Sequence, residues 1–232
     1  MKRSMAAEMM DFPGQPRELL IDDLRNLRRI NRYLGCHRNA LRGVARAIDG
    51  RGKRWFTLLD VGTGSADIPT LIALWARRQN LDCRISCLER ESTTVEQAAI
   101  ETRDLPEVAL IRGDALAAPF RPKCVDFVLA SQLLHHFSDD QMVALLRDWA
   151  CLARHAVIVN DLVRHALAYQ GIRLLTRVVT RNVMTRTDGP LSVQRSLTVD
   201  EWRALFRRAD AGEFVVERAV PYRMLGIIWP RT

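Results

Sequence analysis

A glycine-rich turn and three carboxylates are the residues best suited to bind a charged small molecule. The turn reads Asp60-Val61-Gly62-Thr63-Gly64-Ser65-Ala66-Asp67 and separates an apolar run from a helical pattern. Glycines let the backbone approach a ligand closely, and the N–H groups at the start of a helix attract anionic groups. Glu89 and Asp114 each follow a later apolar run, as Asp60 does. Carboxylates at the ends of successive strands predict a single site at one edge of a sheet.

This turn favours a cationic ligand over a dinucleotide. The dinucleotide fingerprint GxGxxG requires a small third residue, but Asp67 stands at that position and would repel a pyrophosphate. S-adenosylmethionine has a sulfonium, an ammonium and one carboxylate, and it has no phosphate. Glu89 could accept hydrogen bonds from its ribose hydroxyls, and Asp114 could accept one from its adenine amine. The pattern therefore predicts S-adenosylmethionine as the cofactor.

Histidines near the same edge could act as a general base. His135 and His136 follow the apolar run 125–131, and His165 follows the run 156–160. Imidazoles titrate near neutral pH, so each could take a proton from an oxygen nucleophile. His136 is the first choice and His135 the second. The alternative is that one of this pair is packed in the core or caps the next helix.

Strands and helices alternate along the central part of the chain, which predicts an α/β fold with a doubly wound, mostly parallel sheet. Two further strands close the pattern as a hairpin, so the expected sheet has seven strands. Ligands of such sheets bind at the carboxyl ends of the strands. The expected strands are 56–61, 84–88, 108–112, 125–131, 156–160, 214–220 and 224–229, and the helices between them are 68–78, 94–103, 139–152 and 198–209.

The flanks divide the chain into segments. Helical spacing over 18–34 and 41–48 predicts two helices before the first strand, whereas prolines and glycine in 1–16 predict a loose N-terminus. We therefore expect an N-terminal helical segment at 1–50 and a cofactor-binding domain at 51–232.

The stretch 162–196 is helical and rich in arginine, with Gly189-Pro190 as an expected break, and it predicts a lid inserted over the acceptor pocket. One face would be apolar, and the opposite stripe basic. The stripe is either a solvated surface or a contact for an acidic substrate or carrier. The apolar positions are Leu167, Ile172, Leu175 and Val179, the basic ones are Arg173, Arg177 and Arg181, and the candidate substrate-binding residues are His165, Tyr169 and Met184.

Residues 55–165 resemble class I S-adenosylmethionine-dependent methyltransferases. Leu58-Leu59-Asp60-Val61-Gly62-Thr63-Gly64 is similar to their first motif, and Leu133-Leu134-His135-His136-Phe137 is similar to the ubiquinone and menaquinone biosynthesis branch. Arg112-Gly113-Asp114-Ala115, Pro119-Phe120 and Val125-Asp126-Phe127-Val128 resemble a further family stretch. The segments 26–31, 160–165 and 188–193 resemble bacterial methyltransferases of polyketide and other natural-product pathways.

The resemblance implies a Rossmann-like methyltransferase fold and a role for each matching position. The chain departs from the family at Glu89-Arg90-Glu91, where an aspartate followed by a small residue is usual. Glu89 would still reach the ribose, and Arg90 would stack beside the adenine. The methionyl end would lie against Asp60, Gly62, Thr63, Gly64 and Ser131, and the adenine against Asp114 and Ala115.

Charge and hydropathy restrict the partners. The net charge is +8, from 35 basic and 27 acidic residues, but the arginines are spread along the chain and no RNA-binding module is present, so we expect no nucleic acid partner. No apolar run approaches the ~20 residues of a membrane-spanning helix, and no signal peptide is recognisable. We therefore expect a cytoplasmic protein without integral membrane contact, and a homodimer stays open.

The spacing of histidines and cysteines predicts no metal site. The five cysteines form no CxxC pair, and no Cys/His cluster has ligand spacing. Asp114, Asp139 and Asp161 are a minor alternative for magnesium. The favoured function is methylation of a small-molecule acceptor at oxygen, on an aromatic or polyketide-type compound. C-methylation of a quinone precursor and a non-catalytic cofactor-binding partner are the alternatives.

Overall fold

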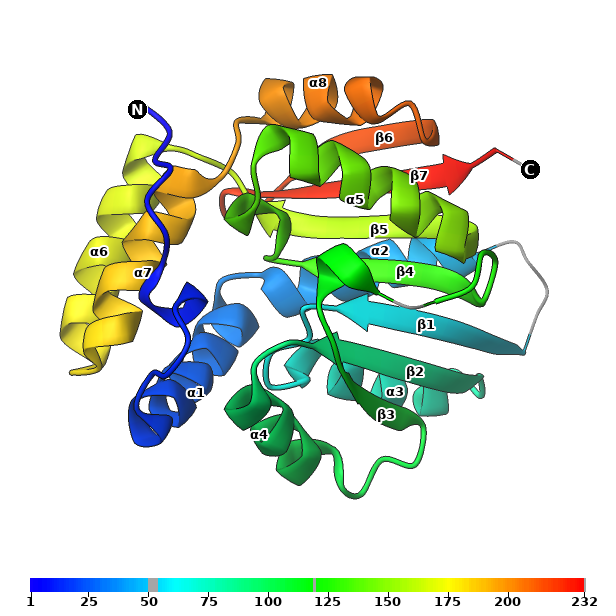
Figure 1. The fold of residues 1–232 in the computed structure, drawn as a ribbon, viewed down its shortest axis with the longest axis horizontal. Helices are drawn as coiled ribbons and strands as arrows, with labels where there is room; N and C mark the ends of the chain where they lie inside the picture. The colour runs from blue at the N-terminus through cyan, green and yellow to red at the C-terminus, as the bar shows by residue number, and fades with distance from the viewer. Residues whose placement is uncertain (50–53, 119, 232) are drawn as a thin grey trace.

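The fold is built on one seven-stranded sheet. The computed structural model describes residues 1–49, 54–118 and 120–231, and the strand order is β3-β2-β1-β4-β5-β7-β6 (Figure 1). Strands β1 to β5 pair in parallel, whereas β7 runs antiparallel to both β5 and β6, which confirms the mostly parallel sheet. The strands are β1 (Trp55–Val61), β2 (Asp82–Glu89), β3 (Val108–Arg112), β4 (Val125–Ser131), β5 (Ala153–Leu162), β6 (Gly212–Ala219) and β7 (Arg223–Pro230).

The helices connect the strands and cover the sheet. They are α1 (Arg17–Tyr33), α2 (Cys36–Ile48), α3 (Asp67–Arg78), α4 (Ser92–Thr102), α5 (Asp139–Leu152), α6 (Ala166–Val179), α7 (Val183–Arg195) and α8 (Val199–Ala209). Three short 3-10 turns are η1 (Met9–Asp11), η2 (Ala115–Ala117) and η3 (Leu134–His136).

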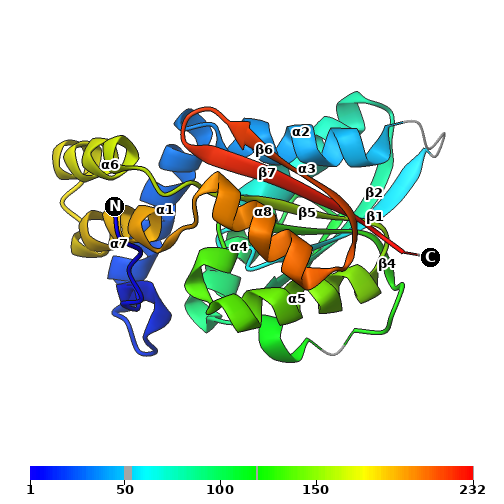
Figure 2. The same ribbon diagram turned by 90° about the horizontal axis from the view of Figure 1, so that it is seen from above.

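Apolar side chains pack on both faces of the sheet. Helices α2 and α3 cover one face, and α5 and α8 cover the other (Figure 2). Strand β4 is buried along nearly its whole length, as expected for a parallel strand between two helical layers. Trp149 of α5 and Trp202 of α8 are the largest fully buried side chains. Helix α2 is part of this core through Cys36, Ala40, Val44 and Ala47.

Helices α1, α6 and α7 form a cap beyond the carboxyl ends of β1 and β5 (Figure 1). The expected break at Gly189-Pro190 is wrong, because α7 continues through Pro190. The chain turns earlier, between α6 and α7, where the Asn182 side chain accepts a hydrogen bond of 3.1 Å from the N–H of Thr185. This cap satisfies a free N–H group at the start of α7 and so begins the helix there.

The N-terminal segment is ordered against α7, so the expectation of a loose segment over 1–16 is wrong (Figure 1). The N–H groups of Met9 and Met10 donate to the two carboxylate oxygens of Asp188, at 2.9 and 3.0 Å. The N–H of Ser4 donates to the carbonyl of Gln194 at 3.1 Å. These partners lie between 178 and 190 residues away in the chain, so no local pattern signals them.

The expected boundary between 50 and 51 lies outside the described residues, as does Pro119 of the family stretch. Within the described ranges, none of the helices has the length and apolar composition needed to cross a membrane.

Candidate active site

A cavity of about 600 Å³ lies at the carboxyl ends of β1, β2 and β4, beneath the cap. This volume falls in the range of small-molecule sites. Every residue predicted to hold the cofactor lines it: Asp60, Gly62, Thr63, Gly64, Glu89, Arg90, Asp114, Ala115 and Ser131. The same cavity also contains His135 and His136, so the structure brings the two predicted groups together.

The glycine loop follows β1 and faces this cavity. Gly62 and Gly64 have positive φ angles of 68° and 55°. A Cβ atom on Gly62 would lie 2.7 Å from the side chain of Leu133, so both the backbone and the packing require glycine there. A Cβ atom on Gly64 would meet nothing within 4 Å, so this part of the loop is open to a ligand.

Asp60 lies at the base of the loop with its side chain almost fully buried. Thr63 Oγ1 donates to its Oδ2 at 2.6 Å. Burial raises the pKa of Asp60 to about 7, because the carboxylate loses hydration, and the nearby Asp67 and Glu89 raise it further. A cationic ligand in the cavity would stabilise the ionised form of this side chain.

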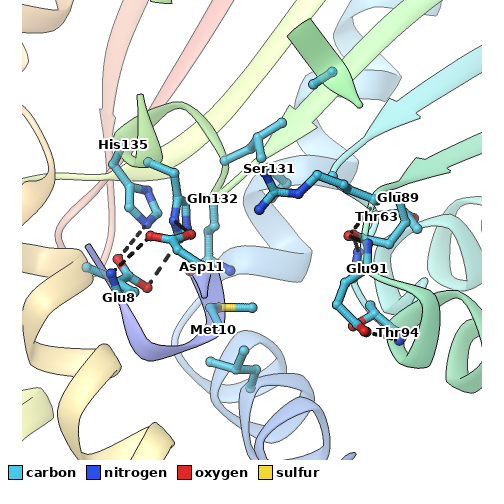
Figure 3. A pocket seen from close by; sticks show the side chains of 18 of the residues that line it. Glu8, Met10, Asp11, Thr63, Glu89, Glu91, Thr94, Ser131, Gln132 and His135 are labelled. Carbon is cyan, nitrogen blue, oxygen red and sulfur yellow. Dashed lines mark hydrogen bonds and ion pairs between the residues drawn. The ribbon is translucent and has the colours of Figure 1, made fainter. Parts of the chain in front are cut away.

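Glu89 at the end of β2 connects the glycine loop after β1 with the loop that follows β2. Its carboxylate accepts hydrogen bonds from the N–H groups of Gly64, Arg90 and Glu91 at 3.0, 2.8 and 3.1 Å (Figure 3). A carboxylate has about four acceptor positions, so one position stays available for a ligand hydroxyl. Burial raises the pKa of Glu89, and these backbone bonds oppose that rise.

The adenine-side candidates lie farther along the edge. Asp114 caps η2 by accepting a bond of 2.9 Å from the N–H of Leu116. Arg90 is exposed at the mouth of the cavity. On the β4 side, Ser131 Oγ accepts a bond of 2.7 Å from Asn160 Nδ2, which fixes the end of this strand to β5.

His135 and His136 occupy η3, and each imidazole is oriented by a carboxylate. His135 Nδ1 lies 2.6 Å from Asp161 Oδ1, and His136 Nδ1 lies 2.9 Å from Asp11 Oδ1. The two rings lie side by side with centroids 4.4 Å apart. The His135 side chain is 2% exposed, whereas that of His136 is 16% exposed and is the more accessible of the two.

Glu8 reaches the same histidines from the N-terminal segment. Its Oε1 lies 3.7 Å from His135 Nε2, and its Oε2 lies 3.9 Å from His136 Nε2 (Figure 3). The side chain is only 1% exposed, and burial raises the pKa of Glu8 to about 7. Sequence reasoning missed Glu8 and Asp11, because both lie in a segment that no periodicity marks as ordered.

Arg195 at the end of α7 holds η3 in place, the histidine turn that carries His135 and His136. Its Nε donates to the carbonyl of His135 at 3.1 Å, and its Nη2 donates to the carbonyl of His136 at 2.8 Å. Nη1 donates to the carbonyl of Ala6, so the same guanidinium also fixes the N-terminal segment. In the sequence, only Arg173, Arg177 and Arg181 of this region form a regular stripe, and no pattern singles out Arg195.

The candidate substrate-binding residues lie outside the cavity lining. His165 is exposed, caps α6 and stacks on Tyr222 with ring centroids 4.8 Å apart. Tyr169 is half-buried on the same helix. Met184 is fully buried and packs with Leu20 and Leu24 of α1. The structure therefore does not place these three at an acceptor site.

Helix α7, rather than α6, faces the cavity, through Asp188, Gly189, Ser192 and Arg195. The expected continuous apolar face of α6 is wrong: Ile172 is buried, but Leu167 and Val179 are exposed. The stripe Arg173, Arg177 and Arg181 is also exposed. The α6 helix thus forms the outer layer of the cap.

The carboxylates weighed for magnesium do not converge. Asp139 forms an ion pair with Arg3, Asp161 is paired with His135, and Asp114 caps η2. In the part of the chain that the structure describes, the side chains with metal-binding atoms within 4.8 Å of one another are Glu8, His135 and His136.

Comparison with known proteins identifies the central segment. Residues 58–155 match the family model described as a methyltransferase domain. No curated protein sequence matches the chain.

Solved structures share the fold. Human N-acetylserotonin methyltransferase, in complex with S-adenosylmethionine, matches with a TM-score of 0.67 and 15% identity over 100% of this chain and 63% of that one, so this chain spans less than two thirds of that relative. A SAM-dependent methyltransferase from Aquifex aeolicus matches with a TM-score of 0.62 and 14% identity, over 91% of this chain and 98% of that one. The CurJ carbon methyltransferase matches with a TM-score of 0.62 and 14% identity, over 84% and 54%.

Proposed function

We propose that this chain, whose residues 58–155 match the methyltransferase-domain model, transfers a methyl group from S-adenosylmethionine to an oxygen of a small-molecule acceptor. One observation carries the proposal: the glycine loop and the histidine turn line a single cavity. A donor bound at the loop and an acceptor bound at the histidines would therefore meet without crossing bulk water. Such juxtaposition supplies much of the rate of a two-substrate transfer.

Three groups of residues would hold the cofactor. The loop Gly62–Gly64 and Asp60 would receive the methionyl end, since a buried carboxylate beside the glycine loop suits an ammonium. Glu89 has an acceptor position for a ribose hydroxyl. Asp114, with Ala115 and Arg90, would border the adenine at the cavity mouth. When bound, S-adenosylmethionine supplies an electrophilic methyl group on a positively charged sulfur.

The histidine turn supports an oxygen acceptor. A hydroxyl becomes a good nucleophile when its proton is removed, and a positioned imidazole is the usual base. Asp11 and Asp161 orient the two imidazoles through Nδ1, which turns each Nε2 towards the interior of the site. We propose that His136, the more exposed of the pair, lies nearest the acceptor. An aromatic or polyketide-type acceptor suits the apolar part of the cavity, where Leu24, Leu27 and Leu162 contribute.

Two other functions stay in view. C-methylation of a quinone precursor is favoured by the similarity of fold to the CurJ carbon methyltransferase. A non-catalytic cofactor-binding role would keep the glycine loop but need no acceptor chemistry. Incubating the protein with S-adenosylmethionine and a panel of phenols, 1,3-dicarbonyls and quinols, followed by mass spectrometry and NMR of the products, separates the three. O-methyl products support the proposal, C-methyl products the first alternative, and cofactor binding without any product the second.

Replacing Glu89 by glutamine should weaken S-adenosylhomocysteine binding by about 1–3 kcal/mol, the range for a hydrogen bond to a charged group. The amide also loses acceptor capacity for the N–H groups of Gly64 and Arg90. Isothermal titration calorimetry checks the result. Glu107→Gln is the matched control, because Glu107 pairs with Arg77 away from the cavity. Equal affinities of the two variants would contradict the assignment of Glu89.

The pH dependence of cofactor binding should report on Asp60. In the unliganded protein this carboxyl has a pKa of about 7, so it is mostly protonated at pH 5.5. A cation beside it favours the ionised form, so affinity should increase with pH, by at most about tenfold per unit, and level off above the pKa of Asp60. Calorimetry with S-adenosylmethionine between pH 5.5 and 7.5 measures the slope. Asp60→Asn should flatten it, and a flat wild-type profile would mean that Asp60 does not face the cofactor's charge.

A further inference from the structure

Three side chains present hydrogen-bond acceptors to one another at the histidine turn: Glu8, His135 and His136. A carboxylate only accepts hydrogen bonds, so Asp161 and Asp11 require the hydrogen to be on Nδ1 of His135 and His136. The neutral imidazoles then present lone pairs at Nε2. Both Nε2 atoms face the Glu8 carboxylate, at 3.7 and 3.9 Å. No hydrogen lies between these acceptors in that protonation state.

Hydrogen bonding leaves this arrangement unexplained. Glu8 Oε1 is buried and has no hydrogen-bond partner among the described residues. Protonated imidazoles would donate to Glu8, but N–H···O bonds have donor–acceptor distances of about 2.7–3.2 Å, shorter than either separation here. A buried acceptor without a donor costs about 1–3 kcal/mol, so one species that satisfies all three atoms at once would stabilise this arrangement.

We propose that Glu8, His135 and His136 bind one divalent transition-metal ion. Two imidazole nitrogens and one carboxylate oxygen on a single ion form a donor set typical of zinc and of non-haem iron or cobalt. Metal–ligand bonds of about 2.0–2.2 Å place ligand atoms about 2.9–3.5 Å apart. The observed 3.7 and 3.9 Å run to the two different oxygens of Glu8, and the three ligand atoms lie within 4.8 Å of one another. The side chains would therefore need to close by no more than about 2 Å to share one ion.

The surrounding side chains support a cation. Metal-binding histidines usually donate their second ring N–H to a carboxylate, which fixes the ring and increases its basicity. Asp161 and Asp11 already occupy that position. Asp188 adds a further carboxylate nearby. Arg195 opposes them, with its Nε 3.7 Å from Glu8 Oε1, but the carboxylates outnumber this one cation.

This inference rests on the proposed function for what the ion would do, although not for its binding. Glu8, His135 and His136 all line the acceptor end of the cavity, so the remaining coordination positions would face the acceptor. A metal ion there would occupy the Nε2 lone pair of His136, so it would replace that imidazole as the group that favours loss of the acceptor's proton. It would also bind the acceptor oxygen and position it opposite the cofactor loop. Acceptors with an oxygen that can coordinate a metal, such as phenols and enolised 1,3-dicarbonyls, would then be preferred.

Titration of the metal-stripped full-length chain with Co²⁺ tests the site, since cobalt bound to nitrogen and oxygen ligands has visible absorption bands. Competition with Zn²⁺ then reports zinc affinity. We expect one equivalent to bind the wild type, and Asp161→Asn to weaken the affinity by about 10- to 100-fold. Glu8→Gln and His136→Asn, which remove ligands, should weaken it more. His165→Asn is the control, because it removes an exposed histidine outside the cavity.

Calorimetry with S-adenosylhomocysteine verifies that each variant is folded and tests the proposed function separately. Cofactor binding without cobalt binding in the wild type would overturn the metal site and leave the methyltransferase proposal intact. Cobalt binding that is equal in Glu8→Gln and the wild type, or that is lost in His165→Asn alone, would also overturn the site. Cobalt binding without cofactor binding would support the site and contradict the proposed function.

Discussion

Replacing His136 by asparagine should lower kcat for methyl transfer by about 100- to 10,000-fold, the range for loss of a general base, and leave cofactor affinity unchanged. His136 lines the cavity through a side chain that is still 16% exposed, and Asp11 holds its Nδ1 at 2.9 Å. Asparagine keeps a polar group of similar size but cannot take a proton at neutral pH. The acceptor hydroxyl would then keep its proton as the methyl group approaches.

The measurement uses an acceptor found in the mass-spectrometric screen, with kcat and KM determined at saturating cofactor. His135→Asn should also reduce kcat, because its ring packs beside that of His136 and shares Glu8. His155→Asn is a matched control outside the cavity lining. Unchanged kcat in both His135→Asn and His136→Asn would remove the histidine turn from the reaction, whether as base or as metal ligand.

Replacing Arg195 by methionine should destabilise the protein by about 3–5 kcal/mol, the cost of removing one partner from a buried ionic cluster. The guanidinium donates to the carbonyls of Ala6, His135 and His136, and it is the cation beside the buried Glu8. Methionine fills a similar volume but donates no hydrogen bond. The variant therefore leaves three carbonyls without this donor and Glu8 without its compensating charge.

Urea unfolding monitored by circular dichroism gives the free-energy difference from the midpoint and slope. Arg195→Lys should lose much of the same stability, because an ammonium cannot match the planar fork of donors that reaches three carbonyls. Arg173→Met is the control, since Arg173 is exposed on α6. A stability of Arg195→Met equal to that of the control would show that the N-terminal segment and η3 do not depend on this guanidinium.

Local sequence was sufficient to predict that the residues proposed to bind the cofactor line one cavity. Asp60 and Glu89 lie in the last two positions of β1 and β2, Asp114 follows β3, and these strands are parallel. In such a sheet the carboxyl ends lie at one edge, so residues far apart in the chain are brought together by the fold class alone. The glycines of the loop were recognisable for the same reason, since a strand that turns directly into a helix limits which residues fit.

The acceptor end depended on contacts that no periodicity encodes. Glu8 and Asp11 belong to a segment without helical or strand pattern, and Asp188 of α7 orders it through two backbone N–H groups. Arg195 was one arginine among many until its carbonyl partners were known. The spacing of residues along the sequence could not mark the cluster of Glu8, His135 and His136 either, because Glu8 lies more than 120 residues from the two histidines.

Sequence by itself determined that helices alternate with the strands of the sheet, but not that α2 covers the sheet or which helix of the cap faces the cavity. The apolar positions of α6 predicted an inner face, yet Leu167 and Val179 are exposed, while α7 contributes Asp188 and Arg195 to the cavity. Hydrophobic periodicity shows that a helix has two faces, and it does not specify what each face meets. Long-range polar contacts decide which helix of the cap faces the cavity, chiefly the hydrogen bonds of Asp188 and Arg195 with the N-terminal segment. Buried charges and backbone groups must be hydrogen-bonded, and their partners can lie anywhere in the chain.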